Sequence, residues 1–431
     1  MAVTAARRTA LEVLLSTSRG RRLDLALGAA LGALPERDRR WVHEAVYGVA
    51  RLRGRLDHLL DRHLRGRTRL APALRDVLRL GAYQLLYMTS VPSYAAVSQS
   101  VEQARLSGGS GAASLTNAVL RSLAREGEDP AHFPDPDDDP AGHLSTWGSH
   151  PRWLVERWLA RWPHADVLSL VERDNRPPPL CLTPLDLSAE DAVARLGEAG
   201  IEARPVGWGS GSVELTGHAS AGRALERIRA AVQDPGAALV TRYADPPEGA
   251  RVADLCAAPG GKTLALSGRA AYVLAADRSL PRLRLLRENL SRTGVSAGLV
   301  VALAEAPPLR EADLVLLDVP CSGTGTLGRH PDARWRLAPE DLGRLAAVQE
   351  RMLEGAAHLV PIGGLLVYST CTLEPEENQE QVERFLRRHR GFRVESTGAV
   401  EAGLLEGQAL VVLPQRTGFD GAFAARLLRT R

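Results

Sequence analysis

The stretch Asp254-Leu-Cys-Ala-Ala-Pro-Gly-Gly-Lys-Thr263 decides the fold of the larger part of this chain. Apolar residues precede it, and the helix-compatible Leu264-Ala-Leu266 follows it. A strand that ends in a glycine turn and continues as a helix is the layout by which a parallel sheet presents a ligand at its strand ends. The stretch also holds Lys262, the only lysine in the chain. Because ammonium and guanidinium groups differ in size, shape and hydration, this lysine indicates a site that arginine would not serve.

The sequence beyond this stretch alternates between strand-like and helix-like segments. Strands are predicted at 251–255, 272–276, 298–302, 313–317 and 364–369. Helices are predicted at 262–268, 280–292, 340–360 and 378–389. Alternation of this kind is typical of a doubly wound parallel sheet covered by helices. Residues 236–431 are therefore expected to form one α/β domain.

The glycine turn lacks the signatures of two familiar phosphate-binding turns. A dinucleotide-binding turn needs G-x-G-x-x-G, and a P-loop needs a glycine where this chain has Cys256. Asp277 ends the next predicted strand, where an acid can accept hydrogen bonds from ribose hydroxyls. The combination fits an adenosyl ligand such as S-adenosylmethionine. The residues expected to bind it are Cys256, Ala257, Ala258, Pro259, Gly260, Gly261, Lys262, Asp277 and Asp318.

Two further turns follow predicted strands of the same sheet. One is Leu316-Leu-Asp-Val-Pro-Cys-Ser-Gly-Thr-Gly325, which contains Asp318 and Cys321. The other is Leu366-Val-Tyr-Ser-Thr-Cys-Thr372, which contains Cys371. A lone cysteine is usually a small buried hydrophobe. Two cysteines and an aspartate at neighbouring strand ends lie where the active sites of such sheets collect, so we expect these side chains to carry chemistry.

Length, charge and cysteine content limit the classes of protein to which the chain can belong. At 431 residues, the chain is long enough for two or three domains. Its net charge of +3 permits a nucleic-acid partner without requiring one. The four cysteines show neither a disulfide framework nor zinc-ligand spacing. We expect no metal site, no signal peptide and no membrane span, and hence a cytoplasmic protein.

Residues 1–126 have the apolar spacing of a helical bundle, because leucine and valine recur at three- and four-residue steps. Arginines crowd the faces predicted to be exposed, which fits either a solvated surface or contacts with a phosphate backbone. These arginines are Arg7, Arg8, Arg19, Arg21, Arg22, Arg37, Arg39, Arg40, Arg51, Arg53 and Arg55. Residues 127–149 are rich in acids and prolines and are expected to be a linker.

Residues 150–235 predict a small α/β unit. Strands are expected at 180–183, 201–206 and 212–215, with a helix at 188–199 that Ser188 caps. The alternation of strands and helix is typical of a sheet with helices on one face, as in many RNA-binding platforms.

Together these stretches resemble the RNA 5-methylcytosine methyltransferases, and among them the Sun/Fmu (RsmB) family, which methylates small-subunit ribosomal RNA. The three turns carry the resemblance, with Pro375-Glu-Glu-Asn378 after the third. Arg75-Asp-Val-Leu-Arg-Leu-Gly-Ala-Tyr83 and Asn117-Ala-Val-Leu-Arg121 resemble the NusB-like RNA-binding domain of those enzymes, and Phe419-Asp-Gly-Ala-Phe423 also fits. The resemblance implies a NusB-like bundle, a small RRM-like unit and a Rossmann-like methyltransferase domain.

The resemblance also implies roles for individual residues. Cys371 would add to carbon 6 of cytosine, which makes carbon 5 nucleophilic enough to take a sulfonium methyl group. Asp318 would contact N3 and the exocyclic amine, Cys321 would assist release, and Lys262 would lie near cofactor and base. The base must be single-stranded or flipped. The side chains expected to grip RNA phosphates or stack on bases are Arg329, His330, Arg334 and Trp335.

One departure from the family pattern concerns an acid that usually follows the third strand. Ala304 occupies the aligned position, and Glu305 lies one residue further on. Either Glu305 substitutes or the cofactor is bound more weakly. Two alternatives stay open, namely a transfer-RNA substrate and a catalytically silent RNA-binding assembly or antitermination factor. We expect a monomer.

Overall fold

The computed structural model describes residues 2–32, 34–64, 70–217 and 220–431. They form two compact units. The first contains Met1–Pro177 and Leu327–Leu337, and the second contains Pro178–Thr326 and Ala338–Arg431. The short segment Leu327–Leu337, called here the arm, therefore belongs to the first unit although both of its ends continue into the second.

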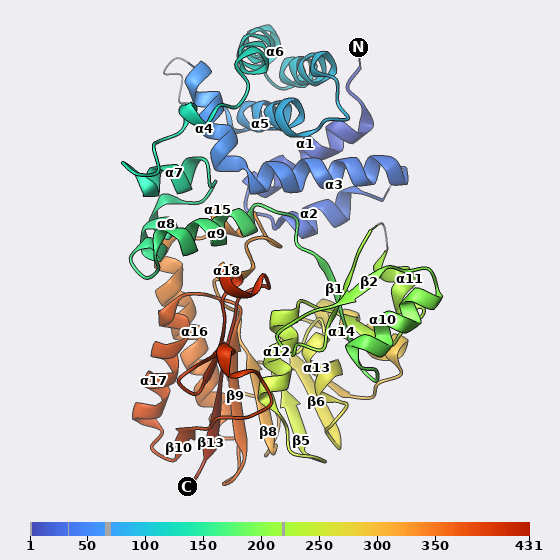
Figure 1. Cartoon of the computed structure of the whole chain (residues 1–431), viewed down its shortest axis with the longest axis vertical. Coiled ribbons are helices and arrows are strands. Elements are labelled where there is room, and N and C mark those ends of the chain that lie inside the picture. Colours follow the sequence, from blue (N-terminus) through green and yellow to red (C-terminus); the bar gives the residue numbers. More distant parts are fainter. Residues whose placement is uncertain (1, 33, 65–69, 218–219) are drawn as a thin grey trace. The chain divides into compact units, whose positions relative to one another are not determined.

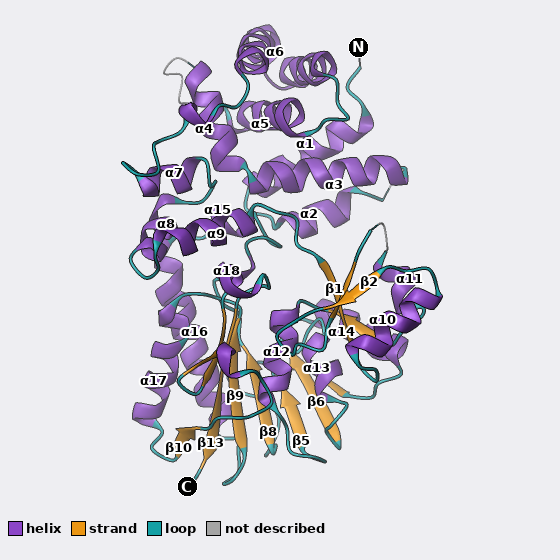
Figure 2. Ribbon diagram, in the orientation of Figure 1, coloured by secondary structure: helices purple, strands orange, loops and turns teal. Residues whose placement is uncertain are grey.

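Helices make up the regular structure of the first unit (Figures 1 and 2). They are α1 (Ala5–Ser18), α2 (Leu23–Ala30), α3 (Glu36–Arg51), α4 (Arg53–His63), α5 (Pro72–Tyr87), α6 (Ser93–Glu126), α7 (Pro140–Thr146), α8 (Arg152–Leu159), α9 (His164–Asp174) and, from the arm, α15 (Ala333–Arg336). The predicted helical bundle is thus confirmed.

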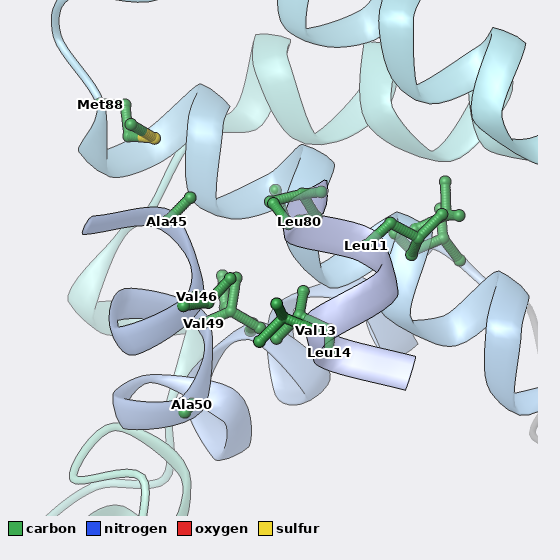
Figure 3. Packing of buried hydrophobic residues seen from close by; sticks show 14 of the residues in the cluster. Leu11, Val13, Leu14, Ala45, Val46, Val49, Ala50, Leu80 and Met88 are labelled. Carbon is green, nitrogen blue, oxygen red and sulfur yellow. The ribbon is translucent and has the colours of Figure 1, made fainter. Parts of the chain in front are cut away.

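The core of this unit is built from the apolar faces of α1, α3 and α5, seen from close by in Figure 3. Leu14 of α1, Val46 of α3 and Leu80 of α5 are buried in one cluster. Burial of such a side chain stabilises the fold by roughly 1.5–3 kcal/mol. The three- and four-residue spacing of the apolar positions places them on the buried face of each helix.

The segment predicted to be a linker is folded. Its acids and prolines begin helical turns, because the Asp139 carboxylate accepts a hydrogen bond from the Gly142 backbone amide at 2.8 Å and Pro140 occupies the first turn of α7. Phe133 is buried in the core of the helical unit. An aspartate before a proline is a helix start as well as a turn signal, which is why composition alone was misleading here.

The second unit opens with a small antiparallel sheet in the order β2-β3-β1-β4. Its elements are β1 (Leu180–Pro184), α10 (Ala189–Glu198), β2 (Ala203–Pro205), β3 (Val213–Leu215), α11 (Ala221–Leu225) and β4 (Ala230–Val232). Ser188 caps α10, as predicted, by accepting a hydrogen bond from the Asp191 amide at 3.0 Å. Strand β4 is the one strand of this sheet that was not predicted from the sequence.

The rest of the second unit is a large mixed sheet with helices. Its strands are β5 (Arg251–Asp254), β6 (Tyr272–Asp277), β7 (Gly298–Val301), β8 (Leu314–Asp318), β9 (Leu365–Thr370), β10 (Phe392–Val394), β11 (Leu405–Glu406), β12 (Ala409–Val412) and β13 (Ala422–Arg429). Its helices are α12 (Pro235–Ala244), α13 (Gly261–Leu266), α14 (Leu280–Thr293), α16 (Pro339–Ala357), α17 (Gln379–Arg388) and α18 (Pro414–Thr417).

The strand order is β11-β12-β13-β9-β8-β5-β6-β7, with β10 paired to β13. Figure 1 labels β13, β9, β8, β5 and β6 side by side in this order. Strands β5 to β9 pair in parallel, as predicted. The predicted strands do not include the C-terminal ones, and β13 runs antiparallel to both β9 and β12. A parallel pair needs a crossover of a dozen or more residues, and the connection between the end of β12 at Val412 and the start of β13 at Ala422 is shorter than that.

Alternate residues of the central strands face opposite helical layers. Val315 and Leu317 of β8 belong to the cluster that contains Leu353 of α16. Leu314 and Leu316 belong to the cluster that contains Leu239 and Val240 of α12, on the other face. With both faces covered, the carboxyl ends of the parallel strands are left to form a site.

Candidate active site

Asp318, the last residue of β8, is held by two side chains from neighbouring turns. Its Oδ1 atom accepts a hydrogen bond from the Ser369 hydroxyl at 2.7 Å, and its Oδ2 atom accepts one from Lys262 Nζ at 2.7 Å. Strand pairing sets the first contact, because Asp318 and Ser369 are register partners of β8 and β9. The structure thus brings together the lysine of the first turn and the aspartate of the second.

Lys262 is protonated in this setting. Burial by itself would lower the pKa of its ammonium group, but the charge and hydrogen bond of Asp318, with the charges of Cys371 and Asp254, outweigh burial and raise that pKa. The side chain therefore presents a fixed positive charge beside a half-exposed carboxylate.

The glycine turn is built by close backbone packing. Gly260 has a φ of +114°, and a Cβ atom there would collide with Leu286 of α14. Thr263, in the first turn of α13, donates a hydrogen bond to the Asp254 carboxyl group at 2.7 Å. Asp254 is buried, and burial raises its pKa to about 7. The turn therefore needs glycine at Gly260, and its geometry depends on a buried acid.

Asp277, at the end of β6, lies against the same turn. Its two carboxylate oxygens accept hydrogen bonds from the amides of Ala258, at 3.2 Å, and Ser279, at 2.8 Å. Arg282 lies 3.6 Å from one of these oxygens. A carboxylate has about four lone-pair sites, so this one can still accept hydrogen bonds from a ligand hydroxyl.

Several acids act on Cys256, in the glycine turn. Burial raises the pKa of the Cys256 thiol, and the charges of Asp318, Asp254, Asp277 and Glu305 raise it further. Cys256 is therefore a neutral thiol surrounded by acids. Such a setting fits a cationic ligand with a sulfonium and an ammonium group, which is the chemistry of S-adenosylmethionine.

The two cysteines of the second and third turns meet. Their sulfur atoms lie 3.3 Å apart, and the Cys371 amide donates to the Cys321 sulfur at 3.4 Å. The hydrogen bond with Cys371 raises the pKa of the Cys321 thiol well above its usual value, and burial and the Cys371 and Glu377 charges add to this shift. Cys321 therefore keeps its proton and lies beside a second sulfur atom.

Relatives of the chain show its family. A probable ribosomal RNA small subunit methyltransferase B from Synechocystis sp. is 35% identical over 94% of both chains. One from Bacillus subtilis is 32% identical over 90% of both chains.

The chain belongs to the RsmB/F family of 16S rRNA methyltransferases.

Three family models match successive segments of this RsmB/F chain and agree with the assignment. The 16S rRNA methyltransferase RsmB/F model matches residues 242–428, the NusB family model matches 4–125, and the RsmF/B-like ferredoxin-like domain model matches 150–221. A crystal structure of PH0851 has a TM-score of 0.79 at 24% identity over the whole of both chains, which shows the same fold. The expected family and fold class are thus confirmed, and S-adenosylmethionine is the methyl donor of this methyltransferase.

The residue after the missing family acid is an acid whose charge acts on the glycine turn. Ala304 is buried in the core cluster beneath α16, so its side chain packs against apolar residues. Glu305 is half-buried, and its charge acts on Cys256. Its backbone packs against Gly355 of α16, where a Cβ atom would collide with it. The position next to the aligned one therefore carries a charge that acts on the turn.

The expected RNA contact of Arg334 is not supported, because its side chain is fully buried in the helical unit. Its guanidinium donates to the carbonyl of Ser149 at 3.0 Å, to the carbonyl of Asp174 at 3.1 Å and to the side chain of Asn175 at 2.9 Å. Burial lowers its pKa to about 10, so it stays charged at neutral pH. Arg334 anchors the arm to the helical unit instead of binding RNA.

Trp335 is also engaged within the helical unit. Its indole nitrogen donates to the Ala50 carbonyl at 2.8 Å, and the Arg53 guanidinium lies 5.4 Å from the ring centroid. This arrangement disfavours the expected stacking on a base. Arg329 and His330 are half-buried in the arm, and their contact with RNA stays a prediction.

Some arginines of the bundle are structural as well. Arg51 donates to the Gly328 carbonyl at 3.1 Å, and Arg55 donates to the Trp147 carbonyl at 2.6 Å. The exposed members of the predicted arginine face include Arg8, Arg19, Arg21, Arg37 and Arg40.

Among the described residues, no cluster of three or more His, Cys, Asp or Glu side chains is arranged to hold a metal ion. Within the same part of the chain, no helix has the length and apolar character needed to cross a membrane.

Sequence reasoning missed the residues that support the two cysteines. Glu377, Asn378, Gln349, Thr324 and Thr372 are all buried and hydrogen-bonded around these turns. Pro375-Glu-Glu-Asn378 stands out in the sequence, but its spacing assigns no role. Gln349 lies in the middle of α16 and gives no signal of its own.

Stability of the Asp254→Asn variant relative to the native protein should depend on pH. The folded state binds the Asp254 proton more tightly than the unfolded state, whose carboxyl has a pKa of about 4. Raising the pH from about 4 to about 7 therefore destabilises the native protein relative to the variant, by up to about 1.4 kcal/mol per pH unit. Denaturant unfolding of both proteins across this range measures the difference, and a difference that does not change with pH would contradict the assignment.

Arg334→Met should destabilise the helical unit. Loss of the guanidinium leaves the Ser149 and Asp174 carbonyls without this donor in a buried site, and the expected loss is about 3 kcal/mol in free energy of unfolding. Chemical denaturation of the full chain measures it. Arg37→Met, at an exposed position of the same unit, is the control and should change stability by less than about 0.5 kcal/mol. Unchanged stability with loss of RNA binding in Arg334→Met would instead restore the original prediction.

Proposed function

We propose that this RsmB/F protein methylates carbon 5 of a cytosine in small-subunit ribosomal RNA through a covalent bond between Cys371 and carbon 6. The observation that carries the proposal is the pair of sulfur atoms 3.3 Å apart, in which the Cys321 thiol keeps its proton. The charge of Cys371 acts on Lys262, which ties this pair to the Lys262–Asp318 contact.

Carbon 5 of cytosine is a poor nucleophile, and the site offers what activates it. Addition of the Cys371 thiolate forms the S–C6 bond and opens the C5–C6 double bond, so that carbon 5 gains enamine character. Asp318 contacts N3 and accepts a hydrogen bond from the exocyclic amine. The Lys262 ammonium offsets the negative charge that addition builds on the ring.

The cofactor is held by the glycine turn and its acids. Gly260 and Gly261 let the backbone approach the ligand, Asp277 accepts from the ribose, and Glu305 supplies the acid that Ala304 lacks. Bound S-adenosylmethionine supplies an electrophilic methyl group on a sulfonium. The negative potential around Cys256 favours that cation.

Release of the product uses the second cysteine. The C5 proton passes to water, the C5–C6 double bond re-forms and the S–C6 bond breaks, so that Cys371 leaves as a thiolate. Cys321 retains its proton and can donate a hydrogen bond to that thiolate from 3.3 Å away. The nucleophile is thereby stabilised as it departs.

The substrate class follows from the family and from the helical unit. The curated relatives are small-subunit ribosomal RNA methyltransferases, and the first unit contains a NusB-family domain with exposed arginines. Such arginines can neutralise RNA phosphates. The presence of Lys262, Asp318, Cys321 and Cys371 argues against a silent assembly factor.

Substitution of the two cysteines should separate formation of the adduct from its release. Cys371→Ala should abolish methyl transfer, because no sulfur can add to carbon 6. Cys321→Ala should trap protein on RNA, because the leaving thiolate loses its donor. A denaturing gel with small-subunit rRNA transcript and S-adenosylmethionine measures both outcomes.

Cys181→Ala is the matched control for the cysteine variants, since Cys181 lies buried in the small sheet. It should methylate RNA and release it like the native protein. An adduct formed by Cys371→Ala and lost in Cys321→Ala would show that the two roles are reversed.

Lys262→Arg should lower the rate of methyl transfer by roughly 100-fold although it keeps the positive charge, because the guanidinium cannot reproduce the single-point contact with Asp318. Single-turnover methylation assays measure the rate. Activity equal to that of the native protein would show that the lone lysine of this chain has no special task.

A further inference from the structure

Glu377 is a buried carboxyl group that the proposed chemistry does not use. It accepts hydrogen bonds from the Ser322 amide at 3.0 Å and from Gln349 Nε2 at 2.7 Å. The same Gln349 nitrogen donates to the Pro320 carbonyl at 3.1 Å. Because Pro320 and Ser322 flank Cys321, these contacts hold the backbone on both sides of that cysteine.

Asn378, the next residue, makes the equivalent contacts around the other cysteine. Its Oδ1 atom accepts a hydrogen bond from the Thr370 hydroxyl at 2.6 Å, and its Nδ2 atom donates to the Thr372 carbonyl at 2.9 Å. Thr370 and Thr372 flank Cys371. Two adjacent residues therefore each hold one of the two cysteine turns.

The two turns are also joined directly. The Ser322 and Thr372 hydroxyl groups lie 2.6 Å apart, and those of Thr324 and Thr372 lie 3.0 Å apart. The Gly325 amide donates to the Cys371 carbonyl at 3.1 Å. All of these hydroxyl groups are on buried residues, where a satisfied polar network makes a structure rigid.

We propose that Glu377 and Asn378, called here the clasp, are positioning residues that set the separation of the two sulfur atoms, Glu377 through the Cys321 turn and Asn378 through the Cys371 turn. The inference rests on the proposed function for its catalytic consequence. Loss of Glu377 disturbs the releasing thiol, whereas loss of Asn378 disturbs the nucleophile. Neighbouring residues in one short turn thus control different steps of one reaction.

A purely structural role for the clasp predicts a different effect when either of its residues is removed. If the clasp only stabilised the fold, removal of either residue would lower formation and release of the adduct together. The chain offers a conservative variant for comparison, because Glu377→Gln keeps an acceptor oxygen for Ser322 while it removes the negative charge that acts on Cys321.

The test uses the full chain with unmethylated small-subunit rRNA transcript and S-adenosylmethionine. On a denaturing gel, Glu377→Ala should accumulate protein–RNA adduct at least about tenfold above the native level, since small displacements at a reacting group have large effects on rate. Asn378→Ala should form no adduct and lose methyl transfer. Glu377→Gln should lie close to the native protein, and Glu380→Gln, at an exposed position of α17, should not differ from it.

Alkylation without RNA separates failure of this inference from failure of the proposed function. The rate of iodoacetamide labelling, read by peptide mass spectrometry, should differ from that of the native protein at Cys321 in Glu377→Ala and at Cys371 in Asn378→Ala. If labelling responds in this way but the native protein forms no adduct, the clasp positions the thiols and the cytosine chemistry is wrong. If both variants label both cysteines as the native protein does, or lose both steps in equal proportion, the clasp proposal is overturned.

Thermal unfolding checks that each variant is folded. Glu377→Asp serves where Glu377→Ala fails to fold, because it keeps the charge but shortens the side chain that reaches Ser322. It should raise the adduct level in the same direction, and a native adduct level in this variant would count against the proposal.

Discussion

The contact between Asp318 and Lys262 depends on the parallel pairing of β5, β8 and β9. Parallel strands end at one edge of a sheet, so turns that are far apart in sequence meet there. The Asp318–Lys262 pair is partly shielded from water, where an unpaired charge would be costly. The strand register that aligns Asp318 with Ser369 therefore sets where the ligand turn and both cysteine turns can lie.

The site combines two electrostatic features. One is the group of acids around the glycine turn, and the other is the protonated Cys321 thiol beside Cys371. Carboxylates surround Cys256 and favour a cationic methyl donor. The thiol of Cys321 keeps its proton mainly because of its hydrogen bond with Cys371. One region of the site thus attracts a cation, while the other holds the protonated Cys321 thiol 3.3 Å from the Cys371 sulfur. The proposed transfer of a methyl group from a sulfonium to a covalently held base requires both features.

Much of this site could be predicted from sequence, because each turn is a local motif at the end of an apolar strand. Arg334 could not be placed, since an arginine near a turn looks like surface and its burial depends on carbonyls distant in sequence. Strand β13 gave no periodic signal, because it is buried along most of its length. Glu377 and Gln349 are recognisable only through their contacts, which no spacing encodes.

The identity of the methylated nucleoside tests the central claim most directly. Unmethylated small-subunit rRNA transcript would be incubated with the protein and isotope-labelled S-adenosylmethionine, digested, and resolved by liquid chromatography and mass spectrometry. We expect the label to appear in 5-methylcytidine and a transfer-RNA transcript treated in parallel to stay unlabelled. Label on a cytosine nitrogen, or in transfer RNA alone, would contradict that claim.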